Sequence, residues 1–486
     1  YQQSNGWGGG GGGYGGGGGY AGGGGGYNAP RGGPNGAGDD KKYVPPLATG
    51  PFLYATDSAI TAEEADAYRK KHDMRVHGSD VPVPLTEFAH ANFPPDIMTE
   101  IKRAGFSQPT PIQAQSWAVA LQGRDVVAIA KTGSGKTCGY MLPGLLHIQR
   151  TRANPQFGPT VLVLAPTREL ACQIKEEADK FGSLSGIRNT CLYGGAPKGP
   201  QLRDLRYGVH VAIATPGRLN DFVEAGAVRL HQVTYLVLDE ADRMLDMGFE
   251  PQIRKIVQHL PTQRQTLFYS ATWPAAVRRI AEQFVSRNQI QVFIGSEQLT
   301  ANKDITQHIE VVDGQLAKTN RLRDILRSFP RGARIIVFCS TKRMCGSLAM
   351  QLERDFGAAA IHGDKSQQER DMVLRMFKTG QRPIMVATDV AARGLDIDNV
   401  QGVVNFDFPS QVEDYVHRIG RTGRAGAKGD AYTFMTPADA KHARSVIKIV
   451  TDAGQPVPPA LEQLSSMPSY GGRGGGRDRY GGGGGY

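Results

Sequence analysis

The sequence predicts an α/β protein that contains two parallel-sheet domains in tandem. Short apolar runs rich in β-branched residues alternate with longer segments of helical spacing, a pattern typical of buried parallel strands covered by helices. A polar stretch near residues 296–304 divides these runs into two series of five. The first series comprises Val126–Ala130, Val161–Ala165, Val209–Ala214, Tyr235–Leu238 and Thr266–Tyr269, and the second comprises Ile335–Phe338, Ala358–Ile361, Ile384–Ala387, Val403–Phe406 and Ala431–Phe434.

Glycine marks both ends of the chain. Of the 63 glycines in 486 residues, 21 lie in residues 1–38 and 10 in residues 471–486. The chain between them has the ordinary globular share of about 7%. Such ends bury too little apolar surface to offset their conformational entropy, so we predict disordered tails. The tyrosines and arginines within them fit either a flexible spacer or weak stacking on nucleic-acid bases.

Composition excludes several classes of protein. The five cysteines are odd in number and include no Cys-x-x-Cys pair, which argues against a disulfide framework and against a zinc site. No run of about 18 apolar residues is present, so no membrane span is predicted. The net charge is +10, and our count assigns +5 to residues 81–300 and +4 to residues 301–470. This positive charge, divided between the two halves of the folded chain, fits a polyanionic partner, but it equally fits a role in solubility.

A short helix is predicted before the first domain. Thr61 and Glu64 have the spacing of a capping box, which marks a helix start. The prolines between residues 82 and 95 then predict an extended lead into the folded body.

The first strand series opens on a phosphate-binding sequence. Val126–Ala130 runs directly into Lys131–Thr137, which is a strand, small-residue loop and helix start of the P-loop type, with Ala130 where the usual pattern has glycine. Glycines let backbone N–H groups approach phosphate oxygens, and the helix N-terminus adds a positive field. We expect Lys136 to reach the β- and γ-phosphates of ATP and the Thr137 hydroxyl to coordinate Mg²⁺. The expected nucleotide contacts are Thr132, Gly133, Ser134, Gly135, Lys136 and Thr137.

Two carboxylates follow the fourth strand of this series, Tyr235–Leu238. In an open parallel sheet, ligands bind at the carboxyl ends of the strands, so Asp239 and Glu240 are expected to face the P-loop. Asp239 would hold Mg²⁺ and Glu240 would polarise the attacking water. The alternative interpretation, acidic residues at a helix N-terminus, would be preferred for the pair on its own.

The sequence Asp239-Glu240-Ala241-Asp242 after a P-loop strand resembles the DEAD-box family of ATP-dependent RNA helicases. Gly105–Gln113 is similar to the family's Q motif, and many further motifs follow in the family's order across residues 52–456. The resemblance implies that each domain is RecA-like. It also implies that Gln113 and the aromatic residue Phe88 recognise adenine.

The resemblance assigns roles to residues of both domains. The residues implied to bind RNA are Pro166, Thr167, Arg168, Gly195, Thr215, Arg218, Gln367, Arg370, Thr388 and Gly394. Ser270, Thr272 and His417 are implied to couple hydrolysis to strand separation. Asp396 is implied to contact the ATP ribose. Arg421 and Arg424 are implied to be arginine fingers, so the catalytic set becomes Lys136, Asp239, Glu240, Arg421 and Arg424.

These implied roles predict an RNA helicase that uses ATP and Mg²⁺. RNA-stimulated ATP hydrolysis would drive local, non-processive unwinding of short duplexes or remodelling of RNA–protein complexes. Hydroxyl and guanidinium donors suit phosphates, so binding of single-stranded and short duplex RNA is expected to be independent of sequence. An ATP-dependent RNA clamp with little unwinding would use the same residues, and a DNA-directed motor of the same superfamily is a second alternative.

The predicted organisation has six parts. They are a glycine- and tyrosine-rich tail (1–51), an extension with a short helix (52–84), the ATP-binding domain (85–297), a linker (298–305), the second domain (306–456) and a glycine- and arginine-rich tail (457–486). The extension and tails resemble the nuclear branch of the family, so we expect a nuclear or nucleolar location, shared in part with the cytoplasm, and RNA-processing proteins as partners.

Overall fold

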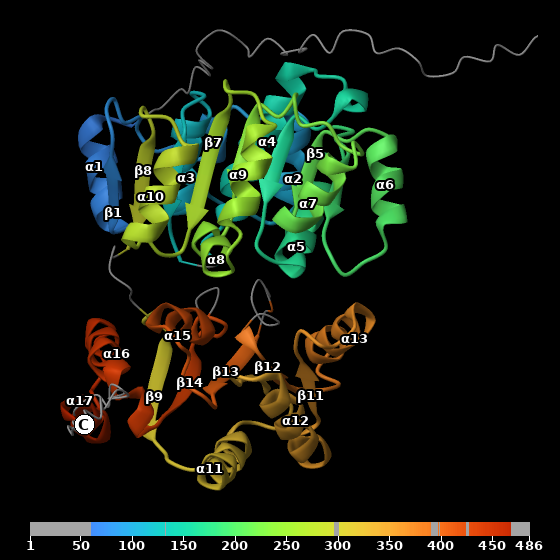
Figure 1. The fold of residues 1–486 in the computed structure, drawn as a ribbon. Coiled ribbons are helices and arrows are strands. Elements are labelled where there is room, and N and C mark those ends of the chain that lie inside the picture. Colours follow the sequence, from blue (N-terminus) through green and yellow to red (C-terminus); the bar gives the residue numbers. More distant parts are fainter. Residues whose placement is uncertain are drawn as a thin grey trace, which may run out of the picture. The chain divides into compact units, whose positions relative to one another are not determined.

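The computed structural model describes residues 60–131, 133–295, 301–389, 397, 399–423 and 427–467. The glycine-rich segments at both ends therefore lie outside the described residues. Two separate β-sheets are present, each flanked by helices (Figure 1). This arrangement confirms the α/β fold with two parallel-sheet domains that the alternating pattern predicts.

The first sheet has eight strands in the order β1-β8-β2-β7-β6-β3-β5-β4. All neighbours pair in parallel except β1, which pairs antiparallel with β8. The strands are β1 (Met74–His77), β2 (Val126–Ile129), β3 (Val161–Leu164), β4 (Asn189–Leu192), β5 (Val211–Ala214), β6 (Tyr235–Leu238), β7 (Gln265–Ser270) and β8 (Ile290–Ile294). The helices are α1 (Ala62–Lys71), η1 (Phe88–Ala91), α2 (Pro95–Arg103), α3 (Pro111–Ala120), α4 (Lys136–Thr151), η2 (Pro155–Phe157), α5 (Arg168–Gly182), α6 (Lys198–Arg206), α7 (Pro216–Glu224), α8 (Ala241–Asp246), α9 (Glu250–Gln258) and α10 (Ala275–Phe284).

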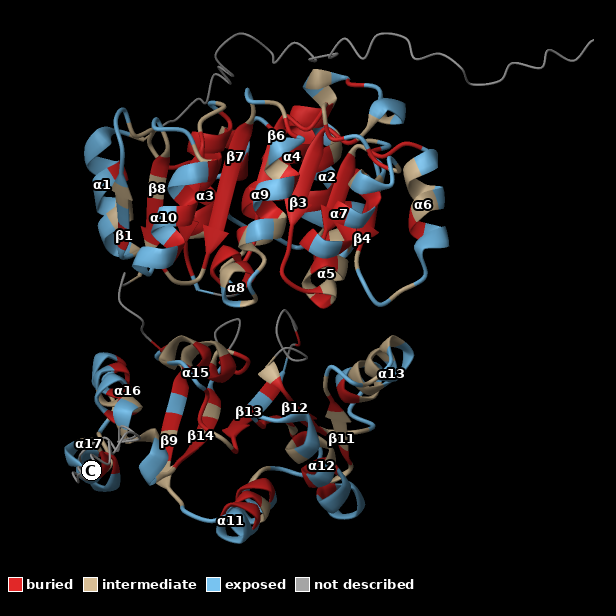
Figure 2. Cartoon of the chain, in the orientation of Figure 1, coloured by how far each residue is buried: buried red, intermediate tan, exposed pale blue. Residues whose placement is uncertain are grey.

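Both faces of the first sheet are buried. Along β3, Val161 and Val163 pack into one hydrophobic cluster, whereas Leu162 and Leu164 pack into another on the opposite face. Helices α2 to α5 supply the first cluster and α7 to α10 the second. Figure 2 shows the strands buried and the outer helix faces exposed. Burial on both faces explains why these strands read as continuous apolar runs rather than alternating ones.

The second sheet has six strands in the order β11-β12-β10-β13-β14-β9, and all of its pairs are parallel. The strands are β9 (Ile305–Val311), β10 (Arg334–Phe338), β11 (Ala358–Ile361), β12 (Ile384–Ala387), β13 (Val400–Asn405) and β14 (Gly429–Met435). The helices are α11 (Gln315–Ser328), α12 (Lys342–Phe356), α13 (Gln367–Lys378), α15 (Val412–Ile419), η3 (Pro437–Asp439), α16 (Ala440–Asp452) and α17 (Pro459–Ser466).

The predicted N-terminal helix is confirmed as α1, with its capping box. The Thr61 N–H donates to Glu64 Oε2 at 2.7 Å, and the Glu64 N–H donates to Thr61 Oγ1 at 3.2 Å. The predicted boundary at residue 85 is too late, however, because β1 joins the first sheet by pairing with β8. Its sequence, Met-Arg-Val-His, has too little apolar character to stand out as a strand.

The prediction that a disordered tail begins at residue 457 is wrong for its first part. Helix α17 begins at Pro459, a position where proline's fixed backbone angle suits a helix start. Leu461 and Leu464 are fully buried in the same cluster as α16 and β9. These two leucines are three positions apart, so they give this short helix one buried face. Residues 468–486 lie outside the described part of the chain.

Cysteines, apolar helices and metal-ligating side chains bear on the classes that composition argues against. All five cysteines are free thiols. Within the described ranges, no helix has both the length and the apolar character needed to cross a membrane. The same residues contain no cluster of three or more side chains suited to hold a metal through histidine, cysteine or carboxylate groups.

Candidate functional site

The motifs of the first domain lie at one edge of its sheet, where the parallel strands end. The nucleotide motifs follow β2, β6 and β7, and the RNA motifs follow β3, β5 and β4. These two groups occupy adjacent halves of the strand order, with β6 and β3 paired at the boundary. Strand order therefore divides the edge into a phosphate-binding half and a half available to a second ligand.

The P-loop geometry depends on its glycines. Gly133 and Gly135 have φ values of +75° and +86°, in the left-handed region that L side chains rarely adopt. A Cβ atom at Gly135 would lie 2.6 Å from Gln113 Nε2, so a side chain at this position would displace the Gln113 amide. Lys136 begins α4, and its Nζ donates to the carbonyl oxygens of Ala130 at 2.9 Å and Ser270 at 3.4 Å. The Lys136 ammonium group is thus held between the carboxyl ends of β2 and β7.

The two carboxylates lie beside this loop. Asp239 is almost fully buried, and burial raises its pKa to about 6, although the Lys136 charge lowers that pKa and the Glu240 charge raises it further. Its Oδ2 accepts from Tyr140 Oη at 2.8 Å and its Oδ1 from the Glu240 N–H at 2.9 Å. Glu240 has φ +49° and ψ +49°, an unusual backbone for a non-glycine residue. Such local strain is concentrated at functional sites.

These residues fit a nucleotide phosphate with Mg²⁺. The buried Ser134 hydroxyl has no hydrogen-bond partner within the described part of the chain, so it can serve a ligand. Carboxylate and hydroxyl oxygens such as those of Asp239 and Thr137 are the ligand type that Mg²⁺ prefers. Thr132, the remaining expected nucleotide contact in the P-loop, lies outside the described residues.

The two residues assigned to adenine recognition have structural partners. Gln113 Oε1 accepts from the Thr110 N–H at 2.9 Å, and its Nε2 donates to the Gly135 carbonyl at 3.0 Å. Gln113 therefore joins α3 to the P-loop. Phe88 is 8% exposed, and its ring lies 5.8 Å from that of Trp117, which is a core position. Contact of either residue with adenine stays a prediction.

Two of the three residues assigned to coupling, Thr272 and His417, lie at a carboxylate oxygen that the sequence did not single out, Asp242 Oδ2. It accepts from the Thr272 N–H at 3.0 Å and from Thr272 Oγ1 at 2.7 Å, while Ser270 Oγ donates to the Thr272 carbonyl at 2.8 Å. His417 Nε2 lies 3.9 Å from the same oxygen. The sequence analysis named Asp242 only as the last residue of the Asp-Glu-Ala-Asp motif and gave it no role of its own.

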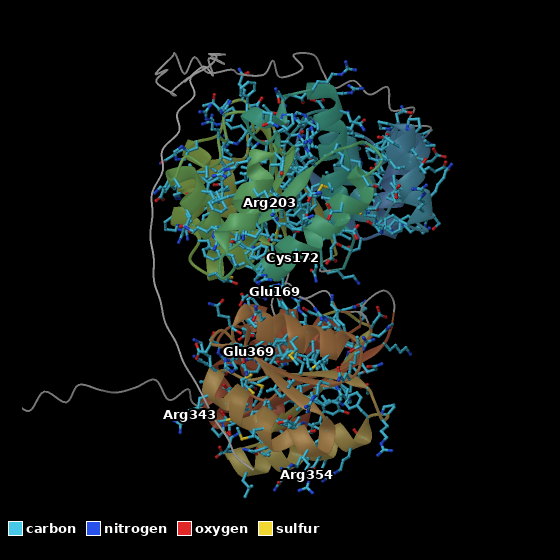
Figure 3. All side chains as sticks on the ribbon, turned by 90° about the vertical axis from the view of Figure 1, so that its right-hand side faces the viewer. Glu169, Cys172, Arg203, Arg343, Arg354 and Glu369 are labelled. Carbon is cyan, nitrogen blue, oxygen red and sulfur yellow. The ribbon has the colours of Figure 1, made fainter. Side chains whose placement is uncertain are left out.

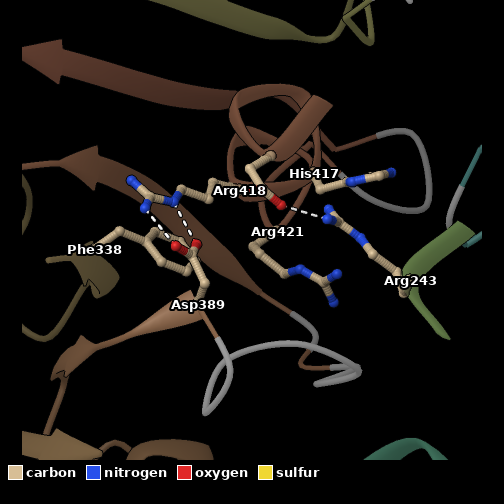
Figure 4. A pocket seen from close by; sticks show the side chains of 7 residues that line it. Arg243, Phe338, Asp389, His417, Arg418 and Arg421 are labelled. Carbon is tan, nitrogen blue, oxygen red and sulfur yellow. Dashed lines mark hydrogen bonds and ion pairs between the residues drawn. The ribbon is translucent and has the colours of Figure 1, made fainter. Parts of the chain in front are cut away.

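Arg421 lines a small pocket beside a buried ion pair (Figure 4). Arg418 donates to both oxygens of Asp389, from Nε at 2.5 Å and from Nη2 at 2.7 Å, and its third nitrogen donates to the Asp407 carbonyl at 2.7 Å. Arg243 pairs with Asp414 on another wall of the pocket. The second predicted arginine finger, Arg424, lies outside the described residues.

In the first domain, the predicted RNA residues occupy the ends of β3, β4 and β5. Thr167 caps α5, and its hydroxyl accepts from the Leu170 N–H at 3.2 Å. The Arg168 guanidinium lies over the Tyr193 ring, 4.4 Å from its centre. Thr215 precedes α7 and is partly exposed. Pro166 is buried and Gly195 is exposed with φ +76°.

Arg218 does not present a free guanidinium. Its Nη1 donates to Gln201 Oε1 at 3.1 Å and its Nη2 to the Ala196 carbonyl at 3.0 Å. The side chain is almost fully buried. Its contacts show that Arg218 supports the loop that contains Gly195, so any effect on RNA through these bonds would be indirect.

In the second domain, Gln367 begins α13 and Arg370 lies one turn later. Arg370 pairs with Glu169 at 2.5 Å, and Arg168 pairs with Asp371 at 3.0 Å. Each of these two predicted RNA arginines therefore pairs with the carboxylate that follows the other arginine in the sequence. Glu169 is labelled in Figure 3 on the first turn of α5. Thr388 is nearly buried directly after β12. Gly394 and Asp396 lie outside the described residues.

The fold and the site define a two-domain P-loop protein whose nucleotide residues and second-ligand residues share one sheet edge. Residues 110–280 match the family description DEAD/DEAH box helicase, and residues 317–426 match Helicase conserved C-terminal domain. The chain therefore belongs to the DEAD-box family of ATP-dependent RNA helicases, and it is an enzyme of that class.

Three plant relatives illustrate the similarity. DEAD-box ATP-dependent RNA helicase 14 of Arabidopsis thaliana is 59% identical over 431 residues, which cover 86% of this chain and 69% of the relative. The ATP-dependent RNA helicase-like protein DB10 of Nicotiana sylvestris is 60% identical, with 85% of this chain and 67% of the relative covered. DEAD-box ATP-dependent RNA helicase 40 of Oryza sativa subsp. japonica is 62% identical, but the chain spans only 51% of its length.

A solved structure supports the fold. The structure of S. cerevisiae Dbp5 bound to RNA and ADP BeF3 has a TM-score of 0.68 and 28% identity, and the match covers 78% of this chain and 99% of that one. Two RecA-like domains are therefore confirmed.

Proposed function

We propose that this protein hydrolyses ATP in response to RNA and uses that cycle for local, non-processive unwinding of short RNA duplexes or for remodelling of RNA–protein complexes. The observation that carries the proposal is the convergence on Asp242 Oδ2, which belongs to the motif that follows the nucleotide-site strand. The same oxygen is contacted by Thr272 and lies near His417. A signal at the nucleotide site therefore has a short physical route to the elements around it.

The residues support in-line attack of water on the γ-phosphate. Lys136 and the P-loop N–H groups would hold the phosphates, and Glu240 would orient and deprotonate the water. Arg421 would place a positive charge at the γ-phosphate, a role typically worth about 10³–10⁵ in rate. Mg²⁺ held by Asp239 and Thr137 would neutralise the charge that develops on the phosphate oxygens.

The RNA-facing residues support recognition of the sugar–phosphate backbone. Arg168, Thr167 and Thr215 offer guanidinium and hydroxyl donors at neighbouring strand ends, and such groups read phosphates rather than bases. Sequence-independent binding that weakens with salt follows from this chemistry. The structure of Mss116p bound to ssRNA and AMP-PNP, with 27% identity and a TM-score of 0.67, is consistent with a single-stranded ligand.

Two assays on the full chain test the proposal. ATP hydrolysis is measured with no nucleic acid, with single-stranded RNA and with DNA of the same sequence, and stimulation by RNA alone is expected. Displacement of one strand of a short RNA duplex is then measured with ATP and with a non-hydrolysable analogue. Equal stimulation by DNA would favour a DNA-directed motor. RNA binding that needs ATP without any strand displacement would favour the clamp.

A further inference from the structure

Tyr140 connects the P-loop helix to the carboxylate at the end of β6. It lies one helical turn after Lys136 on α4, and its side chain is fully buried. Its hydroxyl donates to Asp239 Oδ2 at 2.8 Å, across 99 positions of sequence. Thr137 lies three positions before Tyr140 on the same helix. The Tyr140 phenol therefore contacts one of the two residues expected to hold Mg²⁺, Asp239, from the helix that carries the other, Thr137.

The Tyr140 ring has little freedom to leave this position. It meets the Tyr269 ring of β7 edge-on, with 5.2 Å between ring centres. The Tyr235 hydroxyl of β6 donates to the Tyr140 backbone carbonyl at 2.8 Å. Residues of two strands thus fix both the backbone and the ring, so the hydroxyl is held at one point in the site.

A buried phenol needs some hydrogen-bond partner, and stability alone could explain the contact. The geometry around Asp239 indicates that the contact also orients the carboxylate. With Tyr140 bound to Oδ2 and the Glu240 N–H bound to Oδ1, both Asp239 oxygens are oriented by fixed donors. Outer partners of this kind set the direction of a ligating carboxylate, and their loss typically lowers metal affinity by about 10- to 100-fold.

We propose that Tyr140 is a positioning residue that orients Asp239 relative to Thr137 for Mg²⁺. This inference rests on the proposed function, because it requires Mg²⁺ at these two residues. The consequence is specific: the Tyr140 hydroxyl strengthens nucleotide binding only when Mg²⁺ is present.

The test substitutes Tyr140→Phe, which removes the hydroxyl and keeps the ring. Affinity of the full chain for a fluorescent ADP analogue is measured with Mg²⁺ and with EDTA. Tyr415→Phe is the matched control, because it also removes one hydrogen bond of a fully buried tyrosine, from Tyr415 Oη to Gln307 Oε1 at 2.6 Å, but lies in the second domain. Thermal unfolding of both variants measures the purely structural cost.

The gain in ADP affinity produced by Mg²⁺ is expected to fall by about 10-fold in Tyr140→Phe and to stay at the wild-type value in Tyr415→Phe. Affinity in EDTA should be the same in all three proteins. A wild-type Mg²⁺ effect in Tyr140→Phe, or an equal loss in the two variants, would overturn the positioning role alone. A wild-type protein whose ADP affinity ignores Mg²⁺ would overturn the Mg²⁺ site itself, and this role with it.

Discussion

Asp242 accepts two hydrogen bonds from Thr272 through the same oxygen, one from the backbone N–H at 3.0 Å and one from the hydroxyl at 2.7 Å. His417 Nε2 lies 3.9 Å from that oxygen, and Asp242 Oδ1 accepts from the Arg243 N–H at 3.0 Å. The carboxylate is buried, so few waters can substitute for a lost partner. Asp242 thus joins the segment that follows β6 to the segment that follows β7.

Thr272→Ala removes the hydroxyl donor and leaves the backbone donor in place. Hydrogen bonds to charged groups are worth about 1.5–3 kcal/mol, so the variant should lose at least about 10-fold in duplex displacement. ATP hydrolysis should change much less, because Lys136, Asp239 and Glu240 are untouched. Both rates are measured on one preparation. Thr272→Ser keeps a hydroxyl and should behave like wild type, and equal rates for the Ala and Ser variants would contradict the coupling role.

Glu240→Gln keeps the shape of the side chain and removes its ability to accept a proton. General-base catalysis contributes about 10²–10⁴-fold, so ATP turnover should fall within that range. Binding of ATP and RNA should persist, because the P-loop and the strand ends are unchanged. Glu282→Gln, on the exposed face of α10, is the control for loss of one negative charge. Normal turnover in Glu240→Gln would refute its role as the base.

Much of the fold could be predicted because its strands are buried on both faces. All ten predicted strands occur, since a strand covered on both sides is a continuous apolar run. Three of the four strands that were missed, β1, β4 and β9, lie at sheet edges, whereas β8 lies between β1 and β2. β4 contains Asn189 and Thr190, and β9 alternates buried and exposed residues from Ile305. Edge position relaxes the demand for apolar side chains, and the signal weakens with it.

The site could be predicted where chemistry fixes residue type and spacing. The P-loop and the two carboxylates are such cases, because phosphate and Mg²⁺ accept few alternatives. The contacts of Asp242, Arg418 and Tyr140 depend on which strands become neighbours, and spacing along the chain does not encode this. The resemblance implies that Arg218 binds RNA. The structure instead shows its guanidinium hydrogen-bonded to Gln201 and to the Ala196 carbonyl. The nuclear location and the roles of the tails stay predictions.

Arg418→Lys should destabilise the second domain even though the positive charge is kept. Arg418 uses three nitrogens for Asp389 and the Asp407 carbonyl, and a lysine ammonium cannot reproduce this planar arrangement. We expect a loss of about 1–3 kcal/mol in the free energy of unfolding, measured by thermal or denaturant unfolding of the full chain. Arg444→Lys, at an exposed position of α16, should have no measurable effect. A similar stability for both variants would show that the fork geometry of Arg418 contributes nothing.

His147 predicts a specific acid sensitivity. It is buried on α4, where its Nε2 lies 2.7 Å from Thr234 Oγ1, and burial lowers its pKa to about 4. An unfolded histidine has a pKa of about 6.5, so as the pH falls the unfolded chain takes up this proton before the folded chain does. Acidification from about pH 6.5 to about pH 4 therefore favours unfolding, while above pH 6.5 both states are neutral and the histidine has no effect.

Denaturant unfolding at several pH values measures this contribution. Between pH 6.5 and pH 4.5 the free energy of unfolding of the wild type should fall more steeply than that of His147→Gln, by up to about 1.4 kcal/mol per pH unit. His259→Gln, at an exposed position after α9, should keep the wild-type slope. The comparison uses slopes rather than absolute stabilities, because His147→Gln also changes packing against Tyr235. Parallel slopes for the wild type and His147→Gln would mean that the imidazole is protonated in the folded state as readily as in the unfolded one.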